Sequence, residues 1–351
     1  MKDELLEILR CPVTRTRLTL EIIKATSKTF DNKITNTIFE GILISENDWF
    51  YPIIDGIPRL CVESFIDYKD FLAKNMSNYE EKANLLKQKY SSFLNVIIKK
   101  NKRTKISFEN EWQQFDHNKD RTWNADDEQM LERFYTETNE TKTSLQNLLV
   151  FDAGCGNGKL NNLLGAAGVK NIGMDFSKSI ETANLKNHSA NTHFIQGDVQ
   201  YPPVAFNYFD LVHCSGVLIH TNNTELSFSC LSETVKENGK LSVWLYHPRK
   251  DFIHNLFNVV RIYTSIAPML FQKVFYYGLI FPLSFCAKKI KGNKQNSREM
   301  MVEILDWFTP EFRHEHSHDE VATWFYKRNF NDVQITTKEL FGFNIIGKKY
   351  N

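Results

Sequence analysis

The sequence predicts an α/β protein with a doubly wound, seven-stranded mixed sheet. Three observations indicate this fold. Apolar, strand-like runs alternate with helix-like segments over residues 144–246, a glycine-rich turn follows the first of these runs, and two more strand-like runs come near the end. The chain has 351 residues, of which 42% are hydrophobic, so it can bury a substantial core.

The middle segment shows where each element should lie. Apolar runs of about five residues between turn signals are typical of buried parallel strands. We expect strands at 148–152, 170–175, 192–196, 209–214 and 241–246. We expect helices at 158–166, 178–187 and 224–236. Farther on, Ser317 and Glu320 form an S-x-x-E box that predicts a helix start. The last two strands are expected near 332–337 and 342–348.

Two segments precede the sheet domain, which we expect over residues 107–351. Residues 1–62 form a small α+β unit with a short helix near its start, two strand-like runs near 18–23 and 37–44, and a turn at Asp55-Gly56. Residues 63–106 are a helical, polar linker that ends in the basic run KKNKRTK. We interpret this run as a solvated linker, with a nucleic-acid patch as the alternative.

The net charge of the chain indicates the class of its ligand, and its cysteines indicate its location. The chain has 43 basic and 42 acidic residues and a net charge of +1, which does not favour a dedicated nucleic-acid binder. A small-molecule partner fits better. The six cysteines are scattered, and the first ten residues, MKDELLEILR, are too charged for a signal peptide. We therefore expect a reducing, cytoplasmic location.

Residues 251–290 are a mostly apolar insertion after the fifth strand. They include VFYYGLIFPLSFCA, 14 uncharged residues in which Gly278 and Pro282 should break one long helix into shorter pieces. A bilayer span needs roughly 18 to 20 apolar residues, so we expect a lid, a core helix or an interfacial segment. The aromatic residues of the insertion favour a hydrophobic or aromatic small-molecule acceptor, such as a lipid or a natural-product intermediate, and core packing explains the same residues nearly as well. The lysines at 288, 289 and 291 are compatible with peripheral contact to a membrane or lipid.

The stretch LLVFDAGCGNGKL contains a tight glycine turn directly after a strand. In parallel sheets ligands bind at this edge, where glycine lets the backbone approach them closely. Gly154, Gly156 and Gly158 are spaced G-x-G-x-G, and Lys159 stands where a dinucleotide fingerprint needs glycine or alanine. The spacing of a phosphate-binding P-loop is not found either. The turn therefore favours a ligand without phosphates.

Acidic residues follow the next two strands. Asp175 ends the second strand in NIGMDF, where a carboxylate can accept hydrogen bonds from both hydroxyls of a ribose. Asp198 follows the third strand in FIQGDV and could accept from an adenine amine. A single aspartate after a strand is more often a cap or turn residue. Together with Asp152, however, three acids stand in register at successive strand ends.

With these motifs the sequence resembles the class I S-adenosylmethionine (SAM)-dependent methyltransferases. The resemblance spans about residues 107–349 and rests on VFDAGCGNG, GMDFS, QGDV, FDLVHCSGVLIHT and LSETVKENGKLSVWLY. It implies that SAM is the cofactor and that its methyl group is transferred to an acceptor, which no motif of the sequence identifies. The implied cofactor contacts are Asp152, Gly154, Cys155, Gly156 and Gly158 at the methionine end, Asp175 at the ribose with Phe176 beside it, and Asp198 and Val199 at the adenine. Glu237-Asn238-Gly239 replaces the usual Pro-Gly-Gly turn of the family, and asparagine can adopt the positive φ needed there.

Three more residues are candidates for the site, two histidines on the acceptor side and Trp112 beside the cofactor. His220 and His247 follow the fourth and fifth strands, and a histidine suits a general base near neutral pH. The alternative is a structural role for either ring. Trp112 lies four residues from Phe108, on one face of a helix, where core packing and a lid over the cofactor are about equally expected.

The amino-terminal unit resembles the small zinc-ribbon-like domain found in a subgroup of these enzymes and in a methyltransferase activator subunit. The zinc pattern is degenerate here, because Thr14 stands where a second cysteine should follow Cys11 and the other knuckle, ISEN, has none. We therefore expect no metal. His314, His316 and His318 are interpreted as solvated turn histidines.

The second hypothesis for the whole chain is a non-catalytic module that recruits a protein or RNA and keeps a vestigial cofactor site. The presence of both Asp175 and Asp198 argues against it.

Overall fold

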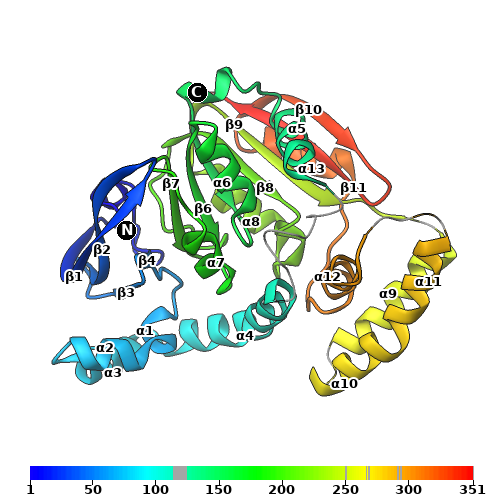
Figure 1. Ribbon diagram of the computed structural model, residues 1–351. Helices are drawn as coiled ribbons and strands as arrows, with labels where there is room; N and C mark the ends of the chain where they lie inside the picture. The colour runs from blue at the N-terminus through cyan, green and yellow to red at the C-terminus, as the bar shows by residue number, and fades with distance from the viewer. Residues whose placement is uncertain are drawn as a thin grey trace.

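The computed structural model describes residues 1–113, 125–249, 251–265, 267, 269–290, 292 and 295–350. Its two sheets have the strand orders β1-β2-β3-β4 and β10-β11-β9-β8-β5-β6-β7, and the second sheet forms the centre of the molecule (Figure 1). Strands β5 to β9 are parallel, whereas β11 runs antiparallel to both β9 and β10. The predicted fold class, a seven-stranded mixed sheet, is confirmed.

The strands of the central sheet lie close to their expected positions. They are β5 (Leu149–Ala153), β6 (Lys170–Asp175), β7 (Thr192–Gln196), β8 (Phe209–Ser215), β9 (Val235–Tyr246), β10 (Phe330–Lys338) and β11 (Gly342–Lys349). The helices that accompany them are α5 (Asp127–Thr138), α6 (Lys159–Ala166), α7 (Ser179–Leu185), α8 (Thr224–Ser232) and α13 (His318–Tyr326). Short 3-10 helices occur at Ser144–Asn147 and Leu218–His220.

Successive side chains of the strands belong to two separate cores. Val150 of β5 and Leu211 of β8 pack with Phe134 of α5 and Leu164 of α6. Their neighbours Phe151 and Val212 belong to the cluster that contains residues of α8 and α13. Because side chains alternate along a strand, helices cover both faces of the sheet, as a doubly wound fold requires.

Helix α8 ends four residues before its predicted end, and β9 begins six residues early. The difference arises at Asn238, which has a φ of 61° and so turns the chain within Val235–Tyr246. This left-handed conformation is the one that the sequence required of the asparagine. At the start of α13, Ser317 caps the helix by accepting from the Glu320 N–H. The Glu320 carboxylate pairs with His316 instead of closing the predicted box.

The amino-terminal module contains a much longer hairpin than its apolar pattern predicts. Its elements are a 3-10 helix (Asp3–Glu7), β1 (Leu18–Phe30), β2 (Lys33–Ser45), β3 (Phe50–Ile54) and β4 (Ile57–Pro58). Most of β1 is exposed, so its outer half lacks the alternation of apolar and polar residues that marks a half-buried strand. The predicted turn at Asp55-Gly56 is present, with both residues at positive φ.

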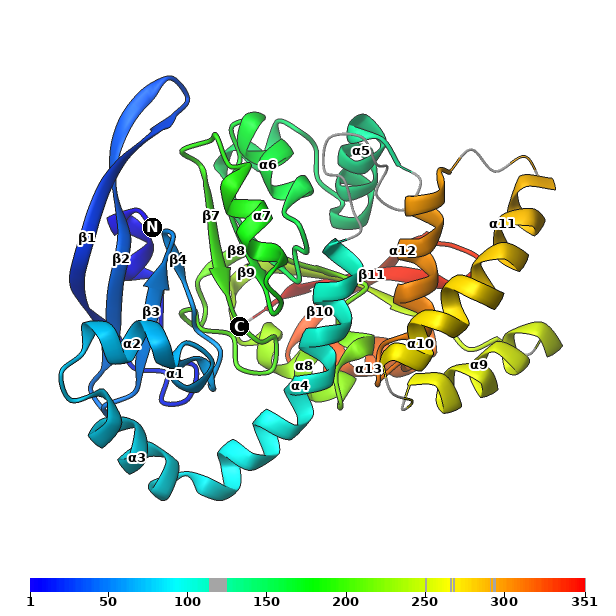
Figure 2. The same ribbon diagram turned by 60° about the horizontal axis from the view of Figure 1, so that its bottom comes forward.

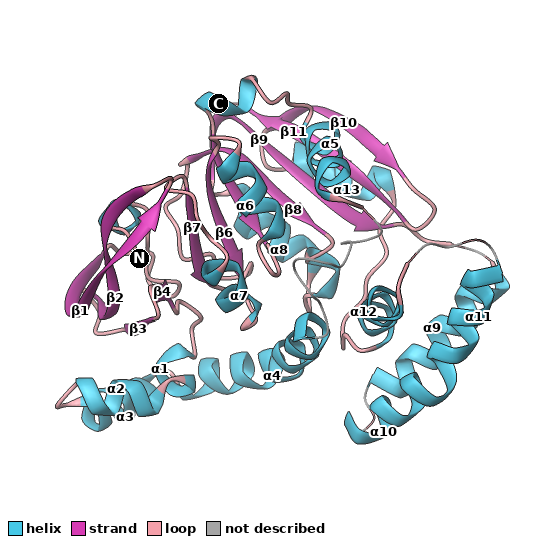
Figure 3. Cartoon of the chain, in the orientation of Figure 1, coloured by secondary structure: helices cyan, strands magenta, loops and turns pink. Residues whose placement is uncertain are grey.

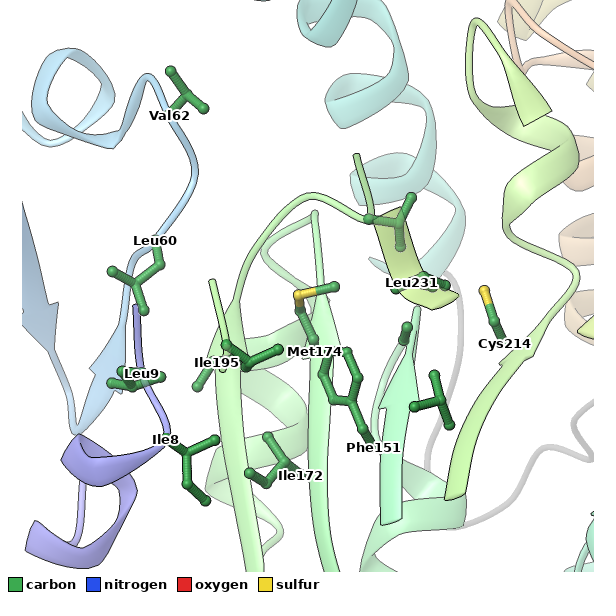
Figure 4. Packing of buried hydrophobic residues seen from close by; sticks show 14 of the residues in the cluster. Ile8, Leu9, Leu60, Val62, Phe151, Ile172, Met174, Ile195, Cys214 and Leu231 are labelled. Atoms are coloured by element: carbon green, nitrogen blue, oxygen red, sulfur yellow. The ribbon is translucent and has the colours of Figure 1, made fainter. Parts of the chain in front are cut away.

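This module packs against the edge of the central sheet at β7. Its Ile8, Leu9 and Leu60 share one hydrophobic core with Ile195 of β7 (Figure 4). The Leu60 N–H donates to the Gln196 carbonyl at 2.8 Å. Arg59, which is buried, forms a 3.0 Å ion pair with Glu181 of α7. The module and the sheet therefore form one continuous packed body.

Residues 64–113 form four helices that lead from the module to the carboxyl ends of the parallel strands (Figures 1 and 3). They are α1 (Ser64–Asp67), α2 (Lys69–Asn75), α3 (Tyr79–Lys89) and α4 (Ser91–Gln113). The basic run lies within α4, and Lys105 pairs with Glu63 at 2.7 Å and with Asp67 at 2.6 Å. Lys99 and Lys102 of the run are exposed, as a solvated segment predicts, whereas α4 brings Lys100 and Lys105 against acidic residues that are distant in sequence.

The insertion forms a helical hairpin followed by a helix on the body of the protein. Its elements are α9 (Phe252–Ser265), α10 (Met269–Phe275), a π-helical segment (Tyr276–Ile280), α11 (Phe281–Ile290) and α12 (Ser297–Phe308). The hairpin lies beyond α12, at the edge of the molecule (Figure 2). The buried Tyr276 joins it to α12 through a 2.9 Å hydrogen bond from its hydroxyl to the Phe308 carbonyl.

The expected break at Gly278 and Pro282 does not occur. The chain stays helical there, and the π-helical turn just before Pro282 accommodates a residue that has no N–H to donate. As a result, Leu270–Ile290 is one helix of 21 residues, and within the described part of the chain it alone is long and apolar enough to cross a membrane. The helix is longer than the uncharged stretch of 14 residues, because it continues beyond both ends of that stretch.

Candidate active site

A cavity of about 440 Å³ lies at the carboxyl ends of the parallel strands, within the usual range for ligand sites. The turns after β5 to β9 form one side, and α4, α5 and α12 contribute side chains to the other. Eight of the predicted cofactor residues line it: Asp152, Gly154, Cys155, Gly156, Asp175, Phe176, Asp198 and Val199. His220, predicted for the acceptor side, lines it as well. Topology therefore brings residues that are far apart in sequence to one site.

The glycine turn has the backbone conformation that its sequence predicts. Gly154, Gly156 and Gly158 all have positive φ. A Cβ on Gly154 would lie 2.1 Å from a methyl group of Val217, and one on Gly158 would lie 2.4 Å from the Ala183 Cβ. Gly158 supports the turn through this packing and is not among the residues that line the cavity. Side chains are thus excluded where the backbone borders the cavity.

Asp175, the last residue of β6, is hydrogen-bonded to the glycine turn. Its Oδ2 accepts from the Gly156 N–H at 2.8 Å, and its Oδ1 accepts from the N–H and hydroxyl of Ser177 at 2.8 and 2.7 Å. Burial raises the pKa of the Asp175 carboxyl, and these donors oppose that effect. With one bond to Oδ2, this oxygen keeps capacity for a ligand hydroxyl.

Asp198 is paired with residues of α4 that the sequence did not single out. Its Oδ2 lies 3.3 Å from the Lys100 Nζ and 3.4 Å from the Asn101 Nδ2, and its Oδ1 accepts from the Gln200 N–H. Lys100, Asn101 and Gln200 all line the cavity. The end of the site beyond β7 is therefore closed by the basic helix.

Cys155 also borders the cavity as a neutral thiol. Burial, together with the nearby carboxylates of Asp175 and Asp152, raises the pKa of Cys155 well above its ordinary value. A thiolate is the nucleophilic form of cysteine, so this residue is unsuited to covalent chemistry.

Asp152 of β5 belongs to a row of buried, charged side chains. The Asp152 Oδ1 lies 2.8 Å from His213 Nδ1, and the Glu137 Oε2 lies 3.0 Å from His213 Nε2. Glu137 also accepts from Arg133 at 2.7 Å. Burial would lower the His213 pKa, but the bonds to both carboxylates outweigh it and raise that pKa to about 9. His213 is therefore an imidazolium near neutral pH, and it holds Asp152 in place.

The sequence analysis missed Arg133, Glu137 and His213, although all three line the cavity. A histidine inside the otherwise apolar strand run DLVHC was a usable signal, since a buried histidine needs polar partners. Glu137 has no local signal, because it lies 76 residues from His213.

The cavity also has an aromatic wall. Six residues contributed by α4, β9, α12 and the segments near 312 and 341 line it: Phe108, Trp244, Tyr246, Trp307, Phe312 and Phe341. Arg313 lies behind this wall, with its guanidinium 4.1 Å from the Tyr246 ring centroid and 4.2 Å from that of Trp307. These rings form an apolar surface next to the polar end of the cavity.

His220 lies within the aromatic wall and is neutral. Its Nδ1 donates to the Phe312 carbonyl at 3.0 Å, and its ring lies 5.6 Å from the Phe108 ring. Burial lowers the pKa of His220 to about 3. A base with so low a pKa is weak near neutral pH, which argues against the predicted role of His220 as a general base.

Two other predicted residues are not placed in the cavity. His247 is absent from its lining, and its ring nitrogens bond to the carbonyls of Pro248 and Glu339. The structure therefore does not support His247 as a catalytic residue: β9 ends in the cavity at Tyr246, and the chain then leaves it. The Trp112 side chain lies outside the described residues.

Within the described residues, no group of three or more potential metal ligands is found. His314 bonds to the Thr221 carbonyl, and His316 bonds to Glu320. The interpretation of these residues as solvated turn histidines was wrong, because the segment before α13 packs against the strand ends. In the amino-terminal module, the buried Cys11 thiol lies 3.3 Å from the Tyr51 hydroxyl.

Comparison with known proteins finds a family match in the central part of the chain. Residues 151–243 match the family model described as a methyltransferase domain. None of the curated proteins matches the chain.

Solved structures share only a distant likeness with the chain. Magnesium protoporphyrin IX methyltransferase from Synechocystis PCC 6803, with bound SAH, is 19% identical with a TM-score of 0.37, over 59% of this chain and 76% of that one. Human N-acetylserotonin methyltransferase in complex with SAM is 15% identical with a TM-score of 0.39, over 63% and 53%. The YcgJ protein from Bacillus subtilis is 15% identical with a TM-score of 0.36, over 62% and 99%. We take no substrate from these likenesses.

Proposed function

We propose that this chain, whose residues 151–243 match a methyltransferase-domain family model, is a SAM-dependent methyltransferase acting on a small hydrophobic or aromatic acceptor. One observation carries the proposal: a single cavity is lined both by the glycine turn with Asp175 and by the aromatic wall. The first part suits a nucleoside with a ribose diol, and the second suits an apolar acceptor.

The residues present fit SAM. The backbone of the glycine turn borders the methionine end, the Asp175 Oδ2 has capacity for a ribose hydroxyl, and Phe176, Asp198 and Val199 border the adenine end. Arg133 lines the cavity near Asp152 and Glu137 and supplies positive charge on that side. When bound, SAM supplies a methyl group that its sulfonium has already activated.

The chain's own contribution is then chiefly alignment of the acceptor. The aromatic wall gives an apolar acceptor a surface on which to pack and excludes water from it. His220 helps to form that wall, since its Nδ1–H ties the segment at Phe312 to the end of β8. With a pKa of about 3 it contributes position more than basicity.

The acceptors that we propose are lipids or lipid-soluble biosynthetic intermediates. The insertion supports this choice, because it exposes apolar side chains next to α12, which lines the cavity with Glu303 and Trp307. We also propose a cytoplasmic location, which is supported by the six free thiols.

For residues 1–62 we propose a fixed, metal-free module derived from a zinc ribbon. The Cys11 contact with Tyr51 supports this proposal, since it uses the remaining cysteine of the degenerate pattern.

Isothermal titration calorimetry tests the cofactor. We expect SAM to bind and NAD to bind at least tenfold more weakly, because Lys159 replaces the third glycine of a dinucleotide turn. Asp175→Ala should weaken SAM binding by about 1 to 3 kcal/mol, since ribose hydroxyls would lose a charged acceptor. Leu185→Ala, a change at an exposed residue outside the cavity, is the control. Comparable affinity for NAD, or unchanged SAM affinity in Asp175→Ala, would contradict the proposal.

A further inference from the structure

The hairpin of α9 and the helix Leu270–Ile290 exposes an unusual amount of apolar surface. Only 6% of the apolar window of this helix is buried. The exposed side chains of the helix are Leu270, Phe271, Val274, Tyr277, Leu279, Leu283 and Ile290. On α9 they are Val259, Ile262 and Tyr263. Exposed apolar patches of this kind mark a binding surface.

The exposed apolar side chains occur along the whole helix, from Leu270 to Ile290, whereas Phe275, Tyr276, Ile280 and Phe281 form the side that packs on α12. A docked protein or a second copy of the chain would cover one face. An apolar surface that extends along the rest of the helix fits lipid, which can cover all of it.

The connections of the hairpin exclude a single crossing of the bilayer. The chain enters from β9, whose Tyr246 lines the cavity, and leaves into α12, whose Trp307 lines the same cavity. Both ends of the hairpin are therefore on one side. Two crossings are also excluded, since the 14 residues of α9 span about 21 Å and the hydrocarbon core is about 30 Å thick.

We propose that this hairpin is a monotopic anchor that inserts into one leaflet of an anionic bilayer. The hairpin lies along the interface, with its exposed apolar side chains among the acyl chains and its Tyr276 side packed on α12. Lys289, in the last turn of α11, lies at the level of the headgroup phosphates, whereas Lys288 is paired with Glu303. Because α12 contacts both α9 and α11, the cavity lies close to the membrane surface. That the cavity can therefore receive a lipid-soluble acceptor from the membrane is a consequence that rests on the proposed function.

Vesicle flotation tests the anchor. The full chain is mixed with phosphatidylcholine vesicles containing a quarter phosphatidylglycerol and is centrifuged through a density gradient. We expect the wild type to float and the double variant Val274→Glu/Leu283→Glu to float at least tenfold less, since charged side chains oppose insertion. Both residues are exposed, so the fold should survive, which a thermal melt checks. Ile34→Glu, at an exposed apolar residue of β2, is the matched control and should float like the wild type.

A second measurement reports depth. Tyr263→Trp should lose most of its added fluorescence with lipids brominated on the acyl chains, whereas Ile34→Trp should not. Failure of the wild type to float, equal flotation of the double variant, or absence of quenching would overturn the anchor. So would a dimer in light scattering that the double variant dissociates, because a second copy would then cover the surface. SAM titration without vesicles separates the two ideas: a chain that floats but does not bind SAM refutes the proposed function and leaves the anchor standing.

Discussion

At the scale of the residue, the clearest effect of environment is the charge on His213. Its folded pKa of about 9 lies above the ordinary value of 6.5, so the stabilisation from its charge is fully present below pH 6.5 and is lost as the pH rises through about 9. A shift of this size corresponds to roughly 3 kcal/mol at 1.36 kcal/mol per pH unit. The positive charge on His213 therefore contributes substantially to the stability of the native state.

We expect the free energy of unfolding of the wild type to fall between pH 6.5 and 9 by more than that of His213→Asn. The asparagine can still donate to Asp152 but carries no charge that titrates. Urea denaturation at a series of pH values measures both slopes, and using the difference between them removes the contribution of other titrating groups. Parallel slopes would show that His213 is neutral in the folded protein.

At the scale of the element, Tyr276 couples the hairpin to the cavity wall. Its buried ring packs with Met301, Ile304 and Phe308 of α12, so Tyr276→Ala should cost about 3 to 5 kcal/mol locally. We expect hydrogen exchange to speed up in α12 and in the hairpin but not in the glycine turn, with SAM affinity within a few-fold of the wild type. Leu283→Ala, at an exposed site, is the control. Unchanged exchange in α12 would mean that this contact does not support the wall.

At the scale of the whole molecule, the module and the central sheet share one core (Figure 4). We therefore expect a single cooperative unfolding transition, seen alike by circular dichroism and by tryptophan fluorescence. Leu9→Ala, at a fully buried residue, should lower the free energy of unfolding by about 2 to 5 kcal/mol, whereas Leu185→Ala should change it by less than about 0.5 kcal/mol. Two separated transitions would show that the module folds independently.

The sequence by itself determined the sheet and the polar end of the site. Periodicity and turn chemistry are local, so Asp152, Asp175 and Asp198 could be assigned to strand ends, and a parallel sheet brings such ends together.

Only the tertiary structure decided which distant residues meet there. The contacts of Lys100 with Asp198 and of Glu137 with His213 join residues 98 and 76 positions apart, and the aromatic wall collects rings from α4, β9 and α12. The tertiary structure also decided the solvent exposure of the helix Leu270–Ile290. Its apolar pattern fits a core helix and a membrane helix equally, and the packing of the chain leaves this helix outside the hydrophobic core. The physical reason is that local pattern governs backbone conformation, whereas burial, pairing and pKa depend on which elements pack together.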